Sequence, residues 1–148
     1  SGSPRAGVAV SVVWGPDAPS GRDRLAARQA ALVDALVAGG PPPDGFDTAR
    51  LDATRRALLR KRAGLAAESW PLLAASFGEG WPAVFARHRD GHEPVGALRD
   101  GWDVARAVTG LTGGAAAELA ARESAFRYDG RRAPRPRLRT RLRRRRRR

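Results

Sequence analysis

Prolines and glycines divide the middle of this sequence into short segments, and this punctuation favours a fold of short helices. The residue before a proline is pushed out of the α region, so a helix that includes Arg55 must end near Trp70, which precedes Pro71. A proline suits the first turn of a new helix, and Trp81-Pro82 repeats the arrangement. We therefore expect an all-α domain whose chain changes direction near Trp70 and again near Trp81.

Apolar residues recur at helical spacing between these breaks and predict a single domain of about six short helices. Ser20–Asp23 resembles a capping box at the start of the first helix, and Asp47 is typical of an N-cap residue for the second. Leu25, Val33 and Leu65 are among the side chains that we expect to face the core. The predicted helices span residues 22–38, 47–70, 71–77, 81–90, 97–109 and 115–128.

The two ends of the chain differ from this helical part. Residues 8–14 are rich in β-branched side chains and predict a strand, but no second strand follows that could pair with it. It is either the remnant strand of an upstream domain or a loosely docked arm. We therefore divide the chain into a linker or remnant strand (1–21), a helical domain (22–130) and a disordered basic tail (131–148).

The formal net charge of +13 is concentrated in the tail. Residues 131–148 contain 12 arginines and no acid, whereas the rest of the chain has 16 basic and 15 acidic residues. Like charges at this density prevent a compact fold, and they suit non-specific binding to phosphate backbones. The alternative is an extension without a function. The candidate nucleic-acid contacts are Arg131, Arg132, Arg135, Arg137, Arg139, Arg141, Arg143 and Arg144.

The composition also limits the compartment and the chemistry. The chain has no cysteine, which excludes disulfides and thiolate chemistry. It shows neither an apolar run of the roughly 18 residues that a membrane span needs nor the apolar core of a signal peptide. We expect a cytoplasmic protein without a membrane partner.

No group of residues forms a catalytic or metal-binding motif. His88 and His92 have the i, i+4 spacing of metal-binding histidines, but Gly91 lies between them at a predicted helix end. Asp100 and Asp103 could act as an acid–base pair, but on an amphipathic helix this spacing is more typical of a solvated face. We therefore expect no enzyme activity, no metal and no cofactor.

The helical part contains one unusual concentration of positive charge, in a stretch without any acid from residue 54 to residue 67. Five cations on two turns repel one another unless acids of neighbouring helices or a bound partner neutralise them, and both explanations remain open. Aromatic residues are most often core, but some could line a groove beside these cations. The hypothetical peptide- or partner-binding residues are Arg55, Arg56, Arg60, Lys61, Arg62, Trp81 and Trp102.

Several stretches of the sequence resemble a known bacterial domain, and the resemblance extends over about residues 22–130. They are LVAGGPPPDGFD, RRALLRKRAG, WPLLAASFGEGWPAVFA, LRDGWDVARAV and ELAARESAFRYDG. These stretches look like an actinobacterial version that follows the oxidase barrel in the same chain. A related resemblance, to the helical domain labelled as DNA-binding in the partner subunits of multinuclear non-haem iron oxidases, is carried by Trp70-Pro71-Leu72-Leu73, Gly78, Trp81, Phe85-Ala86, Pro94 and Gly101-Trp102 with Ala105.

The resemblance implies a role that the residues alone do not give. The oxidases of this family are TIM-barrel enzymes that modify cysteines of ribosomally made peptides, as in methanobactin biosynthesis. The resemblance implies a non-enzymatic accessory module that binds the precursor peptide or the partner iron-dependent oxidase. Since the iron ligands of such oxidases lie in the barrel, it implies no active site here. The alternative function is binding of DNA or another nucleic acid.

Overall fold

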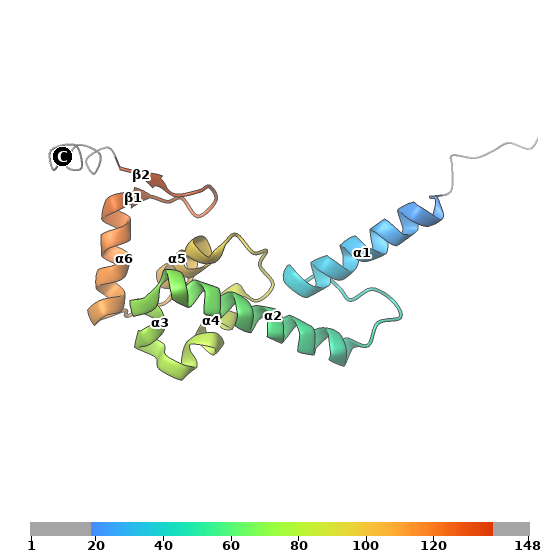
Figure 1. Ribbon diagram of the computed structural model, residues 1–148, viewed down its shortest axis with the longest axis horizontal. Helices are drawn as coiled ribbons and strands as arrows, with labels where there is room; N and C mark the ends of the chain where they lie inside the picture. Colours follow the sequence, from blue (N-terminus) through green and yellow to red (C-terminus); the bar gives the residue numbers. More distant parts are fainter. Residues whose placement is uncertain (1–18, 138–148) are drawn as a thin grey trace, which may run out of the picture.

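The computed structural model describes residues 19–137, which are mainly helical and end in a small antiparallel hairpin (Figure 1). Figure 1 shows α1 at one end of the molecule, α2 through its middle, and α6 with the hairpin at the other end. The elements are α1 (Gly21–Val37), α2 (Thr48–Ser69), α3 (Pro71–Phe77), the 3-10 turn η1 (Gly78–Gly80), α4 (Trp81–Arg89), α5 (Ala97–Ala107), α6 (Gly113–Ala125), β1 (Phe126–Arg127) and β2 (Arg135–Pro136).

The first two helices begin at the predicted caps. The Ser20 hydroxyl accepts the Asp23 backbone N–H at 3.2 Å, and the Asp23 carboxylate accepts the Ser20 backbone N–H at 3.0 Å. Asp47 Oδ1 accepts the Ala49 N–H at 2.9 Å. Each bond satisfies a donor that the helix itself leaves free. Both predicted helix starts are confirmed.

Trp70 ends α2 and starts α3, as its position before Pro71 predicts. Its backbone N–H donates to Ala66 O at the end of α2, and Pro71 occupies the first turn of α3. The indole is fully buried and donates from Nε1 to Leu98 O at 2.8 Å. This one residue therefore ends a helix, turns the chain and connects α2 with the start of α5.

The core lies where α2 packs against α4 and α5, with α3 packed against α6. Its largest fully buried side chains are Trp70, Leu73, Phe85, Trp102 and Val104. The rings of Trp70 and Trp102 meet edge to face, with centroids 5.6 Å apart. A Cβ atom at Gly101 would lie 2.2 Å from Trp70 Cδ1, so the close approach of α5 to this indole depends on glycine.

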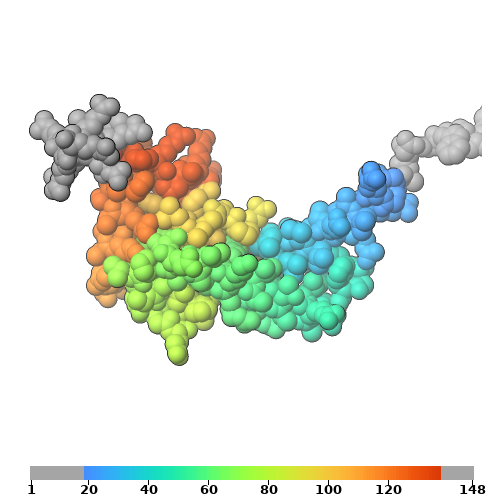
Figure 2. All heavy atoms as spheres, viewed as in Figure 1, coloured from blue at the N-terminus to red at the C-terminus, as the bar shows by residue number. Residues whose placement is uncertain are grey.

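Helix α1 differs from the sequence prediction. Leu25 and Val33 were expected in the core, but they are 58% and 57% exposed, and Leu65 of α2 is 46% exposed. Only Ala35 of α1 is buried, and Figure 2 shows the N-terminal turns of α1 standing out from the body. Helical spacing predicts an apolar face, but within residues 19–137 this face is only partly covered, at Leu32, Leu36 and Val37.

The C-terminal part of the described chain is more ordered than expected. The last helix ends at Ala125 rather than near Tyr128, and Phe126 and Arg127 pair with Pro136 and Arg135. The predicted disordered tail began at residue 131, and for residues 131–137 that prediction is wrong. The hairpin forms because the Asp129 side chain and the strand pairing satisfy local backbone donors.

Two of the sequence predictions concern the ends of the chain, and a third concerns membrane spans. The strand expected at residues 8–14 and the part of the tail after residue 137 lie outside the described residues. No helix between residues 19 and 137 combines the length and the apolar character needed to cross a bilayer.

Candidate functional site

The predicted cation cluster of α2 separates into paired and unpaired members. Arg55 Nε lies 2.7 Å from Asp90 Oδ1, at the end of α4. Arg62 donates from Nη2 to both carboxylate oxygens of Asp100, at 3.2 and 3.1 Å, and from Nη1 to His92 O at 3.0 Å. For these two arginines, acids of neighbouring elements supply the neutralisation that the sequence required.

Asp100 is the centre of a buried polar network. It is 2% exposed, accepts hydrogen bonds from Arg62 and forms an ion pair with Arg89, whose Nη2 lies 3.0 Å from Asp100 Oδ1. Arg89 also pairs with Asp103 at 3.2 Å, and the Tyr128 hydroxyl donates to Asp103 Oδ1 at 2.9 Å. The prediction that Asp100 lies on a solvated face is wrong, because that face of α5 packs against α2 and α4.

Trp81 and Trp102 do not line a surface groove. They are 4% and 1% exposed, and their indole N–H groups donate to Ala63 O and Glu123 Oε1, each at 2.8 Å. Trp81 also packs against Phe85, with ring centroids 5.8 Å apart. Both residues hold the core together, which was the alternative interpretation, and their predicted role in partner binding is wrong.

A hollow of about 240 Å³ lies beside the remaining cations, between α2 and α4. Leu59, Pro82, Ala83 and Ala86 supply its apolar lining, and Arg56 and Arg60 complete it. We call this surface the α2–α4 hollow. Both arginines are exposed, and within residues 19–137 neither of them, nor Lys61, forms an ion pair.

This hollow was only partly indicated by the sequence. Arg56 and Arg60 stand four residues apart and therefore on one side of α2, which the cluster already suggested. The contribution of Pro82, Ala83 and Ala86 was missed. The feature of the sequence that could have indicated them is the run of small residues on α4. Small side chains can leave a space between two helices, but they can also let two helices pack closely, so the sequence alone does not predict a hollow.

The predicted nucleic-acid contacts lie partly in the hairpin. The Arg131 carbonyl accepts from the Arg99 guanidinium, and Arg137 donates from Nε to Phe126 O at 3.1 Å. Arg132 and Arg135 line a second hollow within the hairpin. The other predicted contacts, Arg139, Arg141, Arg143 and Arg144, lie outside the described residues.

A polar joint attaches α6 and the hairpin to α5. Arg106 lies 2.7 Å from Glu123 Oε1 and also donates to the Tyr128 carbonyl at 2.9 Å. The hydrogen bond from Arg106, aided by that from Trp102, lowers the pKa of Glu123. Burial, together with the hydrogen bond to Asp103, raises the pKa of Tyr128. These shifts belong to structural contacts rather than to an open cleft.

The two histidines show no metal-site geometry. His92 Nδ1 lies 3.0 Å from the Asp90 carbonyl oxygen, and His88 lies on α4 before the helix ends. Among residues 19–137, no three side chains of His, Cys, Asp or Glu come together in a way that could hold a metal ion.

Comparisons with known proteins place the chain in a family. The family described as "SCO6045-like, C-terminal domain" matches residues 26–110. A UPF0276 protein of Streptomyces avermitilis is 45% identical over 78 residues, which make up 53% of this chain. The match covers only 16% of that protein, so the chain spans a small part of this relative. No solved structure matches the chain.

Proposed function

Because the chain belongs to the family of SCO6045-like C-terminal domains, we propose that it is a non-enzymatic accessory module of modified-peptide biosynthesis. It binds a precursor peptide or a partner iron-dependent oxidase. The basis for naming an oxidase and a precursor peptide as partners is the sequence resemblance to the helical domains of iron oxidases. The small share of the matched relative that this chain covers supports a role as one domain of a larger protein.

The observation that carries this proposal is the pair of exposed arginines beside the α2–α4 hollow, neither of which forms an ion pair within residues 19–137. Arg55 and Arg62 are held by Asp90 and Asp100, whereas Arg56 and Arg60 present their guanidinium groups to solvent. An arginine binds a carboxylate through two parallel hydrogen bonds, and the apolar lining can cover a small apolar side chain. The hollow therefore suits an acidic segment that contains an apolar residue.

The size of the hollow favours a peptide over a folded partner. A stable interface between folded proteins involves roughly 20–30 residues on each side, whereas six residues line this hollow. Part of its lining is fixed by the fold, since Leu59 is 8% exposed and belongs to the core cluster, against which Ala86 packs. A preformed surface needs little ordering when it binds a flexible segment.

Reversal of one charge tests this site. In the full chain, Arg60→Glu is expected to weaken binding of a fluorescein-labelled acidic peptide at least about tenfold, because hydrogen bonds to charged groups contribute about 1.5–3 kcal/mol. Fluorescence anisotropy measures the affinity, and binding to the unsubstituted chain is expected to weaken as salt is added.

The matched control is Arg50→Glu. Arg50 is exposed in the first turn of the same helix, where a negative charge is favourable, and the charge change is identical. Its variant is expected to bind the peptide like the unsubstituted chain. Equal weakening by both substitutions would mean that the peptide responds to net charge alone, and the hollow would no longer be the binding site.

A second candidate function, binding of nucleic acid, rests on charge. The 12 arginines of residues 131–148 make this end of the chain strongly cationic, and neutralisation of phosphates releases counterions. Such binding requires neither the α2–α4 hollow nor a particular base sequence.

A further inference from the structure

The β1–β2 hairpin places positive charges directly opposite each other. Arg127 of β1 pairs in register with Arg135 of β2. Residues directly opposite on antiparallel strands point to the same face, with Cβ atoms about 4.5–5.5 Å apart, and like charges in these positions repel. An unneutralised pair of this kind is unfavourable for the fold, so an anionic ligand that neutralises both charges relieves the repulsion.

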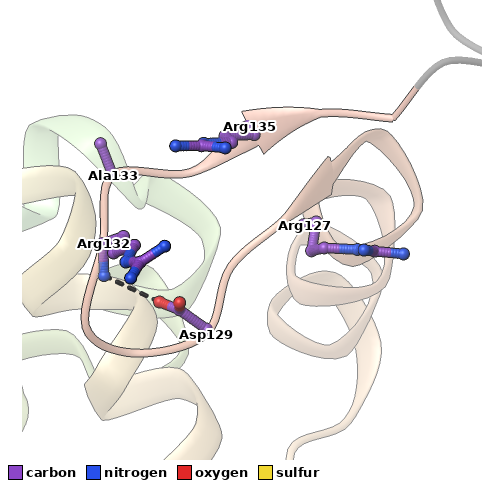
Figure 3. A pocket seen from close by; sticks show the side chains of 5 residues that line it. All are labelled: Arg127, Asp129, Arg132, Ala133 and Arg135. Atoms are coloured by element: carbon purple, nitrogen blue, oxygen red, sulfur yellow. Dashed lines mark hydrogen bonds between the residues drawn. The ribbon is translucent and has the colours of Figure 1, made fainter.

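A third arginine joins this pair around a hollow of about 180 Å³. Arg127, Asp129, Arg132, Ala133 and Arg135 line it, and we call it the hairpin hollow. Figure 3 shows Arg135 and Arg132 extending over the loop, with Arg132 beside Asp129, while Arg127 extends from β1 in the other direction. All three arginines are exposed, so their long side chains can change rotamer to reach a common ligand.

Asp129, the one acidic residue that lines the hairpin hollow, already accepts two hydrogen bonds. Asp129 Oδ1 accepts the backbone N–H groups of Arg132 and Arg131, at 2.7 and 2.8 Å. These two bonds lower the pKa of Asp129, so its charge is constant near neutral pH. Within residues 19–137, Arg127, Arg132 and Arg135 form no ion pair. The formal charge of the lining is therefore +2.

We propose that the hairpin hollow binds a phosphate dianion. At pH 7 such a group carries about −1.5 to −2 charges and three acceptor oxygens, which matches the charge of the lining. A carboxylate or a single phosphodiester carries one negative charge and neutralises only half of it. Arginine is the side chain best suited to phosphate, because its planar fork donates two parallel hydrogen bonds.

The loop that carries the site is held in place before any ligand arrives. Two backbone N–H groups of the loop donate to the Asp129 carboxylate and fix the loop backbone, and the Arg99 guanidinium of α5 donates to the Arg131 carbonyl. The site lies on the hairpin and shares no residue with the α2–α4 hollow, so it stands independently of the proposed function. Free phosphate and a phosphorylated side chain both supply this group.

The test is an NMR titration of the ¹⁵N-labelled full chain with inorganic phosphate at constant ionic strength. Backbone amide shifts in residues 127–135 are expected to change and to follow a single-site binding curve. Arg135→Ala and Arg127→Glu are each expected to weaken binding at least about tenfold, since each removes a charged hydrogen-bond donor. The control is Arg143→Ala/Arg144→Ala, which leaves the hairpin intact and is expected to bind phosphate unchanged.

Several results would overturn the site. They are shifts confined to residues 138–148, equal binding of acetate at the same ionic strength, or binding of a single-stranded oligonucleotide without binding of phosphate. Circular dichroism of each variant checks the fold, and Arg127→Glu is expected to keep it, since it replaces a repulsive cross-strand pair with an attractive one. Tighter binding of O-phosphoserine than of phosphate would identify a phosphorylated side chain as the source, and equal binding would identify free phosphate.

Discussion

The carboxylate of Asp100 neutralises two arginines inside the helical core. Among residues 19–137, Asp100→Ala leaves Arg62 without a carboxylate partner and leaves Arg89 with Asp103 alone, although the two arginine side chains are only 13% and 9% exposed. Loss of one member of a buried ion pair typically costs about 3–5 kcal/mol. We expect a loss of this size in the free energy of unfolding, measured by urea denaturation.

Asp90→Ala is the matched control for this experiment. The Asp90 side chain is 50% exposed where it pairs with Arg55, and exposed ion pairs contribute about 0–1 kcal/mol. We expect this variant to lose no more than about 1 kcal/mol. If the two variants lost equal stability, burial of Asp100 would not be the cause of its effect.

Two helical glycines are expected to respond in opposite directions to the same substitution. Gly101→Ala would place a Cβ atom 2.2 Å from Trp70 Cδ1, and overpacking of a core typically costs about 1–3 kcal/mol. Gly64→Ala meets no atom within 4 Å and is expected to gain about 0.5–1 kcal/mol, because alanine favours the helix. Thermal denaturation of both variants measures the difference. Stabilisation by Gly101→Ala would show that α5 does not approach Trp70 this closely.

At the scale of elements, the joint between α5, α6 and the hairpin makes stability depend on pH. The folded-state pKa of Glu123 is lowered, chiefly by its hydrogen bond from Arg106. The ionised Glu123 side chain therefore adds to the free energy of unfolding at pH values above its pKa in the unfolded chain, about 4.3. This stabilisation is lost as the pH falls through the pKa of Glu123 in the folded protein. Glu123→Gln is expected to be less stable at pH 7 and to lose less stability on acidification.

Tyr128 adds the opposite dependence at alkaline pH. Burial raises the pKa of Tyr128 in the folded protein. Its stabilisation of the fold is therefore complete at pH values below its pKa in the unfolded chain, about 10, and is lost as the pH rises through its pKa in the folded protein. Tyr128→Phe is expected to reduce this alkaline loss. Melting temperatures between pH 3 and pH 11 test both variants, with Glu79→Gln as the exposed control. A Glu79→Gln profile identical to that of Glu123→Gln would contradict the role of the Arg106 contact.

At the scale of the whole molecule, most of the net positive charge lies in residues 131–148, whereas the core residues lie earlier in the chain. Removing residues 138–148 takes away eight arginines and lowers the formal net charge from +13 to +5. The truncation is placed after Arg137, because the Arg137 N–H donates to Ala125 O beside the paired strands. We expect the helical content to be unchanged, since the core cluster ends at Tyr128.

The same truncated chain tests nucleic-acid binding. If the tail carries it, affinity for a DNA duplex falls, and the slope of log affinity against log salt decreases by about 0.9 for each phosphate that the shorter chain no longer neutralises. Filter binding over a range of salt concentrations measures this slope. An unchanged slope would exclude residues 138–148 from the interaction, and the hairpin arginines would then be the next candidates for the phosphate contacts.

Local features of the sequence account for the helices of this protein. The capping groups of Ser20 and Asp47 lie within a few residues of the donors that they satisfy, and Pro71 acts on its immediate neighbour Trp70. Such effects depend on covalent geometry and nearby backbone groups, so they can be read without knowledge of the fold. The helix starts and the breaks near Trp70 and Trp81 were predicted for this reason.

Packing between distant elements, by contrast, controls which side chains are buried and which charges remain free. Arg62 and Asp100 stand 38 residues apart, and nothing in the spacing of either residue reveals that they meet. The pairing of Arg127 with Arg135 likewise depends on how the chain turns after α6. Sequence therefore shows where positive charge is concentrated along the chain. Within the described part of the chain, the three-dimensional arrangement leaves Arg56 and Arg60 without an ion pair and neutralises Arg62 inside the core. The reason is that only folding brings Asp100 within reach of one face of α2.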